Sequence, residues 1–561
     1  MKDESILEAL KDLRDCKDVG VHFADERKRL RSISYAELME RAQRFAGGLF
    51  RCGVRSGEPV ILVMIEPESA IVAILGCMIA GCPPTPIYPP QNLRGVSGFL
   101  QFVKHVAAQS GASYVVAEAQ PYSLLGGIPK ETASVRGVER FGKVMEGARA
   151  ELSTVNPVAF LQFTSGSTSV PKGVQVTHAG LSANLRMIRE AAHMDRDSCV
   201  VTWLPVYHDM GLIGTVLNAI TLPCELVVLP PIAFLKKPRL WLELMSEFRG
   251  THTAAPNFAY GLSVKRVPDT GGLDLSSMTT FICGAEPVLP GTIETFVNHY
   301  ESAGLHPGAM VPAYGLAEAT LAVTFTPHMR GLVTEEVDVN LLSSGLAKTG
   351  GERRIRIASC GVPMNGLAVR IAAESGDCLE ERMVGEIQIQ GASVTPGYVG
   401  DEESTRASRT QDGWLRTGDL GYLANGELYP CGRIKDVIII RGKNFHAHDL
   451  ENIASEVAGV RTGNVVAFSV REDSGESLVL VAETRIDDQT AEIARKIRTH
   501  LAESIGIAPD EVVVVPAGTL PKTSSGKLKR SETRRFYQEG TLTKKQGALS
   551  ALQTAVKAFW R

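Results

Sequence analysis

The chain has 561 residues, which is too long for a single hydrophobic core, so two or more domains are expected. Apolar residues make up 44% and charged residues 22% of the sequence, as is typical of a soluble globular enzyme. A formal net charge of -3 leaves no basic excess, so neither nucleic acid nor an anionic membrane is an expected partner.

The N-terminal residues 1–15 are charged throughout and lack the apolar run of a signal peptide. The longest apolar stretches are too short or too interrupted to cross a bilayer, so no transmembrane segment is expected. The 10 cysteines form no CxxC pair, and no histidine cluster accompanies the closest two, Cys77 and Cys82. The sequence therefore predicts reduced, buried thiols in a cytoplasmic protein and no zinc site.

The first half of the chain alternates helical patterns with short β-rich runs. Helical spacing of apolar residues occurs in 36–50 and 71–80. Strand-like runs occupy 59–65, 114–118, 159–163, 226–229 and 279–282. Strands separated by helices indicate parallel α/β layers, which bind ligands at the carboxyl ends of their strands.

After Ser343 the pattern changes to short strands separated by Gly-rich turns, which predicts a β-rich subdomain. These strands are expected at 355–358, 368–372, 385–390 and 426–429. Residues 449–516 then mix helix and strand, enough for a small α+β domain. The predicted fold class is α/β: a large N-terminal domain of layered α/β subdomains with a β-rich subdomain, and a small mobile C-terminal domain. Its predicted parts are residues 1–432, a hinge at 433–436, and residues 437–561.

Two segments differ from their surroundings. Residues 327–354 are polar and weakly periodic, which indicates an insertion. The tail at 541–561 has the pattern of a basic amphipathic helix. Packing on its own domain is favoured over a membrane or partner contact for this helix.

A Ser/Thr/Gly-rich loop at 164–174 follows the strand predicted at 159–163 and precedes a helical segment that starts near Ala179. Small residues allow the backbone to approach phosphate oxygens, and Lys172 adds a positive charge. The candidate phosphate-binding residues are Thr164, Ser165, Gly166, Ser167, Thr168 and Lys172. A flexible linker is the alternative, which the position between a strand and a helix disfavours. The spacing is not that of a Walker A motif.

This loop resembles the signature of the acyl-adenylate-forming superfamily, which comprises acyl-CoA synthetases, peptide-synthetase adenylation domains and luciferases. Further segments resemble the other motifs of this superfamily and occur in the same order along nearly the whole chain. They are 281–287, 314–320, 413–421, 432–436 and 520–530. The resemblance implies that a carboxylate attacks the α-phosphate of ATP and expels pyrophosphate.

The resemblance also implies how the nucleotide is held. Glu318 is expected to ligate Mg²⁺ beside the phosphates, since Mg²⁺ prefers oxygen ligands. The remaining nucleotide-binding candidates are Tyr314 and Gly315, Gly284, Ala285 and Glu286 on the adenine side, Asp419 at the ribose hydroxyls, and Arg433 at the ribose or phosphates. Taken alone, Tyr314 would more often be a core aromatic residue, and only the motif favours the adenine contact. Asp419 alone is typical of a turn, and the alternative for Glu318 is a solvated surface carboxylate.

Three further residues take roles from the resemblance. Lys527 is expected to bridge the substrate carboxylate and the α-phosphate, where it would offset developing charge. Without that context, the basic run around Lys527 is typical of a solvated surface. Lys435 matches the hinge about which the small domain rotates. His208 matches a position between the acyl and nucleotide sites, although a lone His is often a core residue.

The segment 203–214 is similar to fatty acyl-AMP ligases, as are 87–90 and 255–260. Asp209 leaves another idea open, because amino-acid-adenylating domains use an Asp near here to bind the substrate ammonium. Apolar side chains that suit an alkyl chain, or any core, are Met210, Ile213, Phe258 and Tyr260.

The segment 327–354 lies where fatty acyl-AMP ligases carry an insertion that restrains the small domain and disfavours the CoA-thioester conformation. The resemblance therefore implies an enzyme that uses ATP and Mg²⁺ to make fatty acyl-AMP and loads the phosphopantetheine thiol of an acyl carrier protein. Too few residues follow Arg530 for a carrier domain, so the carrier is expected to be a separate protein. The alternatives are a fatty acyl-CoA synthetase and a non-catalytic nucleotide-binding homologue.

Overall fold

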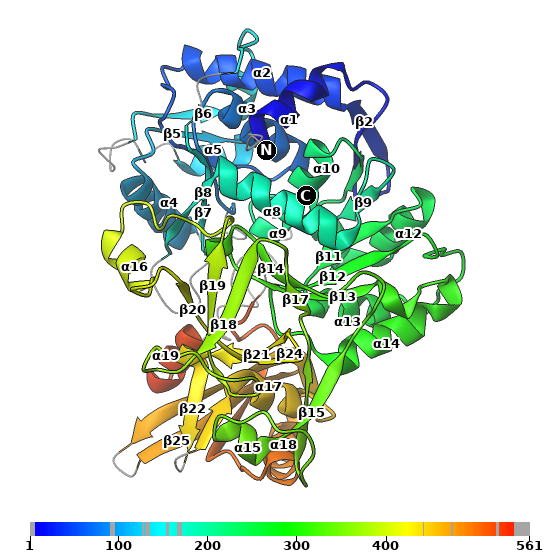
Figure 1. Ribbon diagram of the computed structural model, residues 1–561, viewed down its shortest axis with the longest axis vertical. Helices are drawn as coiled ribbons and strands as arrows, with labels where there is room; N and C mark the ends of the chain where they lie inside the picture. The colour runs from blue at the N-terminus through cyan, green and yellow to red at the C-terminus, as the bar shows by residue number, and fades with distance from the viewer. Residues whose placement is uncertain are drawn as a thin grey trace.

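The computed structural model describes residues 6–89, 96–125, 128, 135–152, 156–164, 171–440, 443–472, 475–522 and 527–542. Figure 1 shows a large N-terminal domain above a smaller C-terminal domain, both of mixed α/β structure, as the sequence predicts. Among the described residues, no helix combines the length and apolarity needed to span a bilayer.

A 9-stranded sheet forms the centre of the large domain. Its strands are β1 (Gly20–Ala24), β2 (Leu30–Ser34), β9 (Cys199–Thr202), β10 (Glu225–Val228), β11 (His252–Ala255), β12 (Thr280–Cys283), β13 (Met310–Gly315), β14 (Ala322–Phe325) and β17 (Val362–Pro363). Strands β1, β10, β9, β11, β12 and β13 are parallel neighbours in that order, while β2, β14 and β17 pair antiparallel at the two ends. The carboxyl ends of the parallel strands therefore share one edge.

A second, fully parallel sheet has the order β4-β3-β5-β6. Its strands are β3 (Val60–Val63), β4 (Pro84–Pro86), β5 (Tyr114–Ala117) and β6 (Gly137–Arg140). The described α-helices that precede β14 are α1 (Ile6–Asp12), α2 (Tyr35–Arg51), α3 (Pro67–Ile79), α4 (Val96–Ser110), α5 (Ala119–Leu125), α7 (Phe141–Val144), α8 (His178–Ala192), α9 (Asp209–Gly211), α10 (Asn218–Thr221), α11 (Pro231–Lys236), α12 (Arg239–Glu247), α13 (Asn257–Arg266) and α14 (Pro290–Tyr300).

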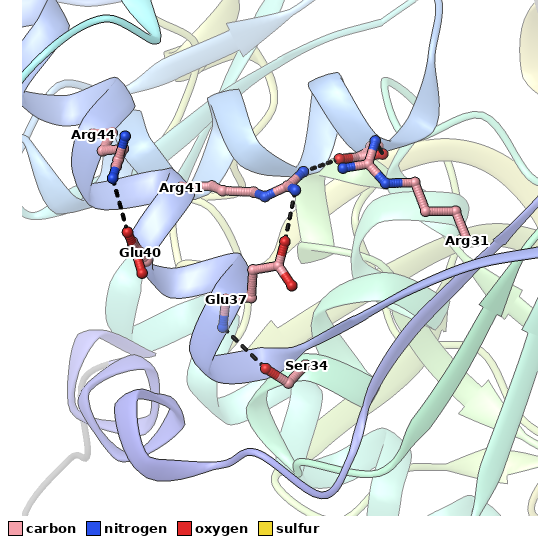
Figure 2. Close-up of polar contacts among 7 residues, drawn as sticks. Arg31, Ser34, Glu37, Glu40, Arg41 and Arg44 are labelled. Carbon is pink, nitrogen blue, oxygen red and sulfur yellow. Dashed lines mark hydrogen bonds and ion pairs between the residues drawn. The ribbon is translucent and has the colours of Figure 1, made fainter.

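Helices α2 and α3 show how local chemistry supports this packing. The Ser34 hydroxyl caps α2 by accepting a hydrogen bond from the Glu37 amide at 3.2 Å. Arg41 pairs with Glu37 one turn earlier, at 2.6 Å, and with Glu68 on α3 (Figure 2). A Cβ at Gly76 of α3 would lie 2.7 Å from Cδ1 of Phe45 on α2. The two helices therefore approach this closely because position 76 has no side chain.

The β-rich subdomain contains a 4-stranded antiparallel sheet in sequence order. Its strands are β18 (Leu367–Ala372), β19 (Gly385–Gly391), β20 (Leu415–Ala424) and β21 (Glu427–Arg433), and α16 (Glu402–Ala407) lies between β19 and β20. Strands found here agree with those expected at 368–372, 385–390 and 426–429.

The C-terminal domain follows β21 with the two-stranded β22 (Val437–Ile440) and β23 (Lys443–His446). Its other elements are α17 (Ala447–Ser455), β24 (Val460–Glu472), β25 (Gly475–Thr484), α18 (Thr490–Ile505), β26 (Glu511–Pro516) and α19 (Arg530–Gln538). Leu450, Leu480 and Leu501 are each 0% exposed in one apolar cluster, so the domain has a core of its own. Most of the predicted tail helix, 543–561, lies outside the described residues.

The segment predicted as an insertion, 327–354, contains β15 (Thr334–Asp338) and α15 (Val339–Ser343) and ends at β16 (Arg354–Ala358). Strands β15 and β16 form an antiparallel pair. In Figure 1 this pair and α15 extend from the large domain down to the C-terminal domain, beside α18. Val339 is 8% exposed and belongs to the same apolar cluster as Ile438, Phe445 and Leu501. The segment is therefore packed on the small domain.

Candidate active site

The adenine-side candidates lie at the carboxyl ends of two neighbouring parallel strands. Gly284, Ala285 and Glu286 follow β12, and Tyr314 and Gly315 end β13. Ala285 has a φ of 66°, a left-handed conformation that L side chains rarely adopt and that strained functional turns often contain.

Glu286 is fixed by the backbone of α13. The Phe258 amide donates to its Oε1 at 2.6 Å. Burial raises the pKa of the Glu286 carboxyl, while that amide and the charges of Lys527 and Lys522 lower it. The carboxylate of Glu286 therefore contributes negative charge that attracts lysines of the C-terminal domain.

Asp419 contacts two other predicted nucleotide residues, Tyr314 and Arg433. The Tyr314 hydroxyl donates to Oδ2 of Asp419 at 2.7 Å, and Arg433 Nε lies 3.0 Å from Oδ1. Asp419 and Arg433 are cross-strand partners on β20 and β21. Burial raises the pKa of Asp419, and Arg433 together with Tyr314 opposes that rise. The structure thus brings the predicted adenine, ribose and phosphate contacts to one place.

Glu318, the predicted metal ligand, lies in a short turn directly after β13. Tyr398 donates its hydroxyl to Oε1 of Glu318 at 2.8 Å, and the Thr395 amide donates to the Glu318 carbonyl at 2.8 Å. Thr320, which ends the turn, has a φ of 72° and is 2% exposed. Burial raises the pKa of Glu318, and the Tyr398 hydrogen bond lowers it.

The surroundings of Glu318 fit a Mg²⁺ ion that shares its ligands with a substrate. No group of three or more His, Cys, Asp or Glu side chains in the described part of the chain could hold a metal alone. Mg²⁺ commonly takes one or two protein carboxylates and completes its shell with water and substrate phosphates. Glu318 beside the nucleotide residues suits that mode.

The phosphate loop joins two antiparallel strands, β7 (Val158–Phe163) and β8 (Gly173–Thr177). The expectation of a direct strand-to-helix turn was wrong, because β8 intervenes before α8 begins at His178. The predicted contacts Ser165, Gly166, Ser167 and Thr168 lie outside the described residues.

The two ends of this loop are held together. The Thr164 amide donates to the Lys172 carbonyl at 3.0 Å, and the Lys172 amide donates to the Thr164 hydroxyl at 3.4 Å. The Lys172 ammonium lies 4.9 Å from the centre of the Tyr398 ring. The loop end that carries a positive charge is therefore beside the residue that contacts Glu318.

Lys527 comes from the C-terminal domain and is half-buried among carboxylates of the large domain. Burial lowers the pKa of Lys527, as does the charge of Arg433, whereas Asp209, Glu286 and Asp419 raise it. The arrangement of the two domains therefore places the predicted catalytic lysine at the nucleotide site.

His208, predicted to lie between the acyl and nucleotide sites, is paired with its neighbour Asp209. His208 Nδ1 lies 2.6 Å from Asp209 Oδ1 at the start of α9. Burial would raise the pKa of Asp209, but His208 and Lys527 outweigh it and lower the pKa. A π-helical turn, Leu212–Leu217, follows α9, a geometry frequent at functional sites. Asp209 thus pairs directly with His208 and also interacts with the charge of Lys527.

The predicted acyl-pocket residues occupy different surroundings. Met210 and Tyr260 belong to one apolar cluster, which Phe258 packs against, while Ile213 belongs to another. Tyr260 is 0% exposed and donates its hydroxyl to the Ile282 carbonyl at 2.7 Å. Phe258 is half-buried and lies edge-on to Trp203, with ring centres 6.1 Å apart. The acyl-pocket assignment stays a prediction.

The motifs gave no role to several residues that position the lysine loop. Arg530 pairs with Glu451 at 2.8 Å and with Asp436 at 2.5 Å, so the end of the loop is joined to the predicted hinge. Before the loop, the fully buried Glu483 accepts the amides of Gly518 and Leu520, both at 2.9 Å. Lys435 is exposed between β21 and β22, and its role as the hinge stays a prediction.

Together these contacts gather the predicted nucleotide residues at one edge of the parallel strands, and Lys527 of the small domain lies within reach of their charges. Residues 15–399 match the family model described as AMP-binding enzyme. Residues 435–547 match the model described as Disco-interacting protein 2-like, AMP domain. The chain belongs to the AMP-binding enzyme family, whose members use ATP, and it is a ligase.

The chain aligns with related proteins over more than nine-tenths of its own length and of theirs. The chain is 34% identical to the medium-chain-fatty-acid–[acyl-carrier-protein] ligase JamA of Moorena producens, over 92% of this chain and 91% of that protein. It is 32% identical to a putative acyl-CoA synthetase of Caulobacter vibrioides, over 93% and 94%. A solved structure from work on fatty acyl-adenylate ligases of E. coli and L. pneumophila has a TM-score of 0.89 and 30% identity, covering 96% and 98%.

Replacing Lys527 by Ala is expected to abolish adenylate formation and to leave the fold intact. The reason is that the substitution removes the positive charge that faces Asp209, Glu286 and Asp419. ATP–pyrophosphate exchange measures the loss. Lys529→Ala is the matched control, because within the described residues the ion pair of Lys529 is with Glu532, at 3.2 Å. Near-normal exchange by a folded Lys527→Ala protein would remove this residue from the mechanism.

The exchange reaction is also expected to weaken at alkaline pH. Burial lowers the pKa of Lys527 from its ordinary value of 10.5, so the ammonium loses its charge at a lower pH than an exposed lysine does. The kcat/KM for ATP, followed from neutral to alkaline pH, should therefore fall with an apparent pKa below 10.5. Any residual activity of Lys527→Arg should lack this fall, since arginine stays charged. An identical alkaline fall in that variant would contradict the assignment.

Proposed function

We propose that this enzyme activates a fatty acid as fatty acyl-AMP, with Mg²⁺, and transfers the acyl group to the phosphopantetheine thiol of a separate holo-acyl carrier protein. The observation that carries the proposal is the packing of the predicted insertion, 327–354, on the small domain through Val339, together with Lys527 beside the predicted nucleotide residues. The name of JamA, an acyl-carrier-protein ligase, supports the acceptor.

In the first half-reaction, a carboxylate oxygen forms a bond to the α-phosphorus of ATP while the bond to the β-phosphate oxygen breaks and pyrophosphate leaves. Both reactants are anions, so the site must offset charge and hold an in-line geometry. Lys527 would lie between the carboxylate and the α-phosphate. Asp419 would accept the ribose hydroxyls, and Tyr314 would lie against adenine.

Glu318 would hold Mg²⁺ together with the triphosphate, and the ion would neutralise charge on the phosphate oxygens. His208 and Asp209, which directly precede the π-helical turn, would line the acyl side, where Asp209 also interacts with the charge of Lys527. In the second half-reaction, the carrier thiol loses its proton, its sulfur bonds to the acyl carbonyl carbon, and AMP leaves.

The acceptor proposal depends on how firmly the small domain is held. Val339 of α15 packs into its core beside Ile438 and Phe445. The Arg353 guanidinium also covers Gly506 at the end of α18, where a Cβ would lie 2.0 Å from Nη1. A rotation of the small domain about 433–436 would have to break these contacts, and this supports the carrier rather than CoA as acceptor.

Two other functions are less well supported. The Caulobacter relative is named a putative acyl-CoA synthetase, which keeps CoA as the second candidate acceptor. A non-catalytic nucleotide-binding protein is disfavoured, because Glu318, Asp419 and Lys527 are all present and the charges of Asp419 and Lys527 interact.

The deciding assay offers the enzyme ATP, Mg²⁺ and a panel of fatty acids, first in pyrophosphate exchange and then with either CoA or a holo-acyl carrier protein. Exchange that depends on a fatty acid, followed by acylation of the carrier in preference to CoA, is the expected result. Efficient acyl-CoA formation would replace the ligase assignment with a synthetase. Exchange with none of the acids would remove the fatty acid as substrate.

Loosening the contact between α15 and the small domain should raise acyl-CoA formation relative to carrier acylation. Val339→Ser removes an apolar side chain from the shared cluster and should make rotation of the small domain easier. Ser344→Ala is the control, an exposed position at the end of the same helix. The ratio of the two products reports the effect. An unchanged product ratio in a folded Val339→Ser protein would show that this segment does not determine the acceptor.

A further inference from the structure

Tyr398 touches both charged groups that surround the predicted triphosphate position. Its hydroxyl donates to Oε1 of Glu318 at 2.8 Å, and its ring centre lies 4.9 Å from the Lys172 ammonium. Among the described residues, Tyr398 alone donates a side-chain hydrogen bond to Glu318. None of the motifs in the sequence assigned this tyrosine a role.

The backbone around Tyr398 is fixed on both sides. The Val399 amide donates to the Gly173 carbonyl at 2.8 Å, and the Gln175 amide donates to the Gly397 carbonyl at 3.0 Å. Tyr398 and Val174 are antiparallel bridge partners. The segment that carries Tyr398 is therefore an extra strand-like partner of β8, the strand that leaves the phosphate loop.

The same segment also holds the turn that contains Glu318. The Thr395 amide donates to the Glu318 carbonyl at 2.8 Å, and the Thr395 hydroxyl donates to the Gln175 carbonyl at 2.6 Å. Tyr398 is thus supported by the two elements whose side chains it contacts. A shift of either element would move the phenol relative to Glu318 or to Lys172.

The two contacts of Tyr398 differ in chemistry. The hydrogen bond from the phenol fixes the position of Oε1 of Glu318, and carboxylate oxygens are the ligands that a hard divalent cation binds. An aromatic ring face attracts an ammonium within about 6 Å. Asp401 also attracts Lys172 electrostatically. Tyr398 and Asp401 therefore both favour the observed position of the Lys172 ammonium.

We propose that Tyr398 is a positioning residue that orients Glu318 for the Mg²⁺–ATP complex and keeps Lys172 in place beside the phosphate loop. The hydroxyl of Tyr398 holds the Glu318 carboxylate by a hydrogen bond, and the ring attracts the Lys172 ammonium. The proposal rests on the proposed function, because it takes Glu318 as the carboxylate that meets the metal. Tyr398 itself need not touch the nucleotide.

Two substitutions separate the two contacts. Tyr398→Phe keeps the ring beside Lys172 and removes the hydrogen bond to Glu318, whereas Tyr398→Leu removes both. Equilibrium binding of Mn²⁺ in the presence of α,β-methylene-ATP, followed by electron paramagnetic resonance on the full chain, reads the metal contact without turnover. ATP affinity at saturating Mg²⁺, measured by calorimetry, reads the lysine contact.

The expected result is a rise of about tenfold in the Mn²⁺ dissociation constant for Tyr398→Phe, with little change in ATP affinity at saturating Mg²⁺. Tyr398→Leu should weaken both. The matched control is Tyr422→Phe, which removes a phenol-to-carboxylate hydrogen bond to Glu335, 3.2 Å long, in the β-rich subdomain. A Tyr398→Phe protein that binds Mn²⁺ like the wild type, or no more weakly than the Tyr422→Phe protein, would overturn the proposal.

Glu318→Gln distinguishes failure of this inference from failure of the proposed function. If Glu318→Gln weakens Mn²⁺ binding and Tyr398→Phe does not, only the role of Tyr398 is wrong. If neither matters, the metal assignment is wrong as well. Lys172→Met gives a second test that does not depend on the stability of Tyr398 variants: it should weaken ATP binding, and Tyr398→Leu should add little in that background. Additive effects of the two substitutions would contradict the lysine contact.

Discussion

The balance of charge around Lys527 is the interaction on which the rest of the site depends. A half-buried ammonium is costly unless anions face it, and Asp209, Glu286 and Asp419 of the large domain supply them. Each of these carboxylates is held by a different contact, from His208, the Phe258 amide and Tyr314, respectively. The site therefore favours a lysine from the small domain before any substrate enters.

The position of Lys527 is set over a longer range by the small domain. Glu483 holds the chain before the lysine loop, and Glu451 holds Arg530 after it. Arg530 also forms an ion pair with Asp436 at the predicted hinge. The segment with α15 adds an apolar contact from the far side of the domain. The contacts that orient the small domain therefore also determine where the Lys527 ammonium lies.

Several of the predicted nucleotide residues lie directly after strands whose sequence patterns are clear, so their proximity could be expected from the sequence. Tyr314 and Ala285 end up close together because β12 and β13 are adjacent parallel strands. Sequence reasoning missed β8 after the phosphate loop, since the run 173–177 is short and a helical pattern follows at once. From the sequence, Asp209 was considered only as a residue that could bind the ammonium of an amino-acid substrate.

Tyr398 and Arg530 could not be assigned from local sequence, because their partners are distant along the chain. Tyr398 is 80 residues from Glu318, and Arg530 is 79 residues from Glu451. Burial of an ordinary tyrosine or arginine carries no signal of the carboxylate it contacts. The packing of α15 on the small domain could not be predicted either, because the segment that contains α15 is polar and only weakly periodic.

A crystal structure of the enzyme with α,β-methylene-ATP, Mg²⁺ and a fatty acid would test the central claim most directly, because this nucleotide cannot release pyrophosphate. The account predicts the Lys527 ammonium between the fatty acid carboxylate and the α-phosphate, with the ribose hydroxyls at Asp419 and the metal at Glu318. A bound nucleotide with Lys527 exposed on the surface, remote from the α-phosphate, would contradict it.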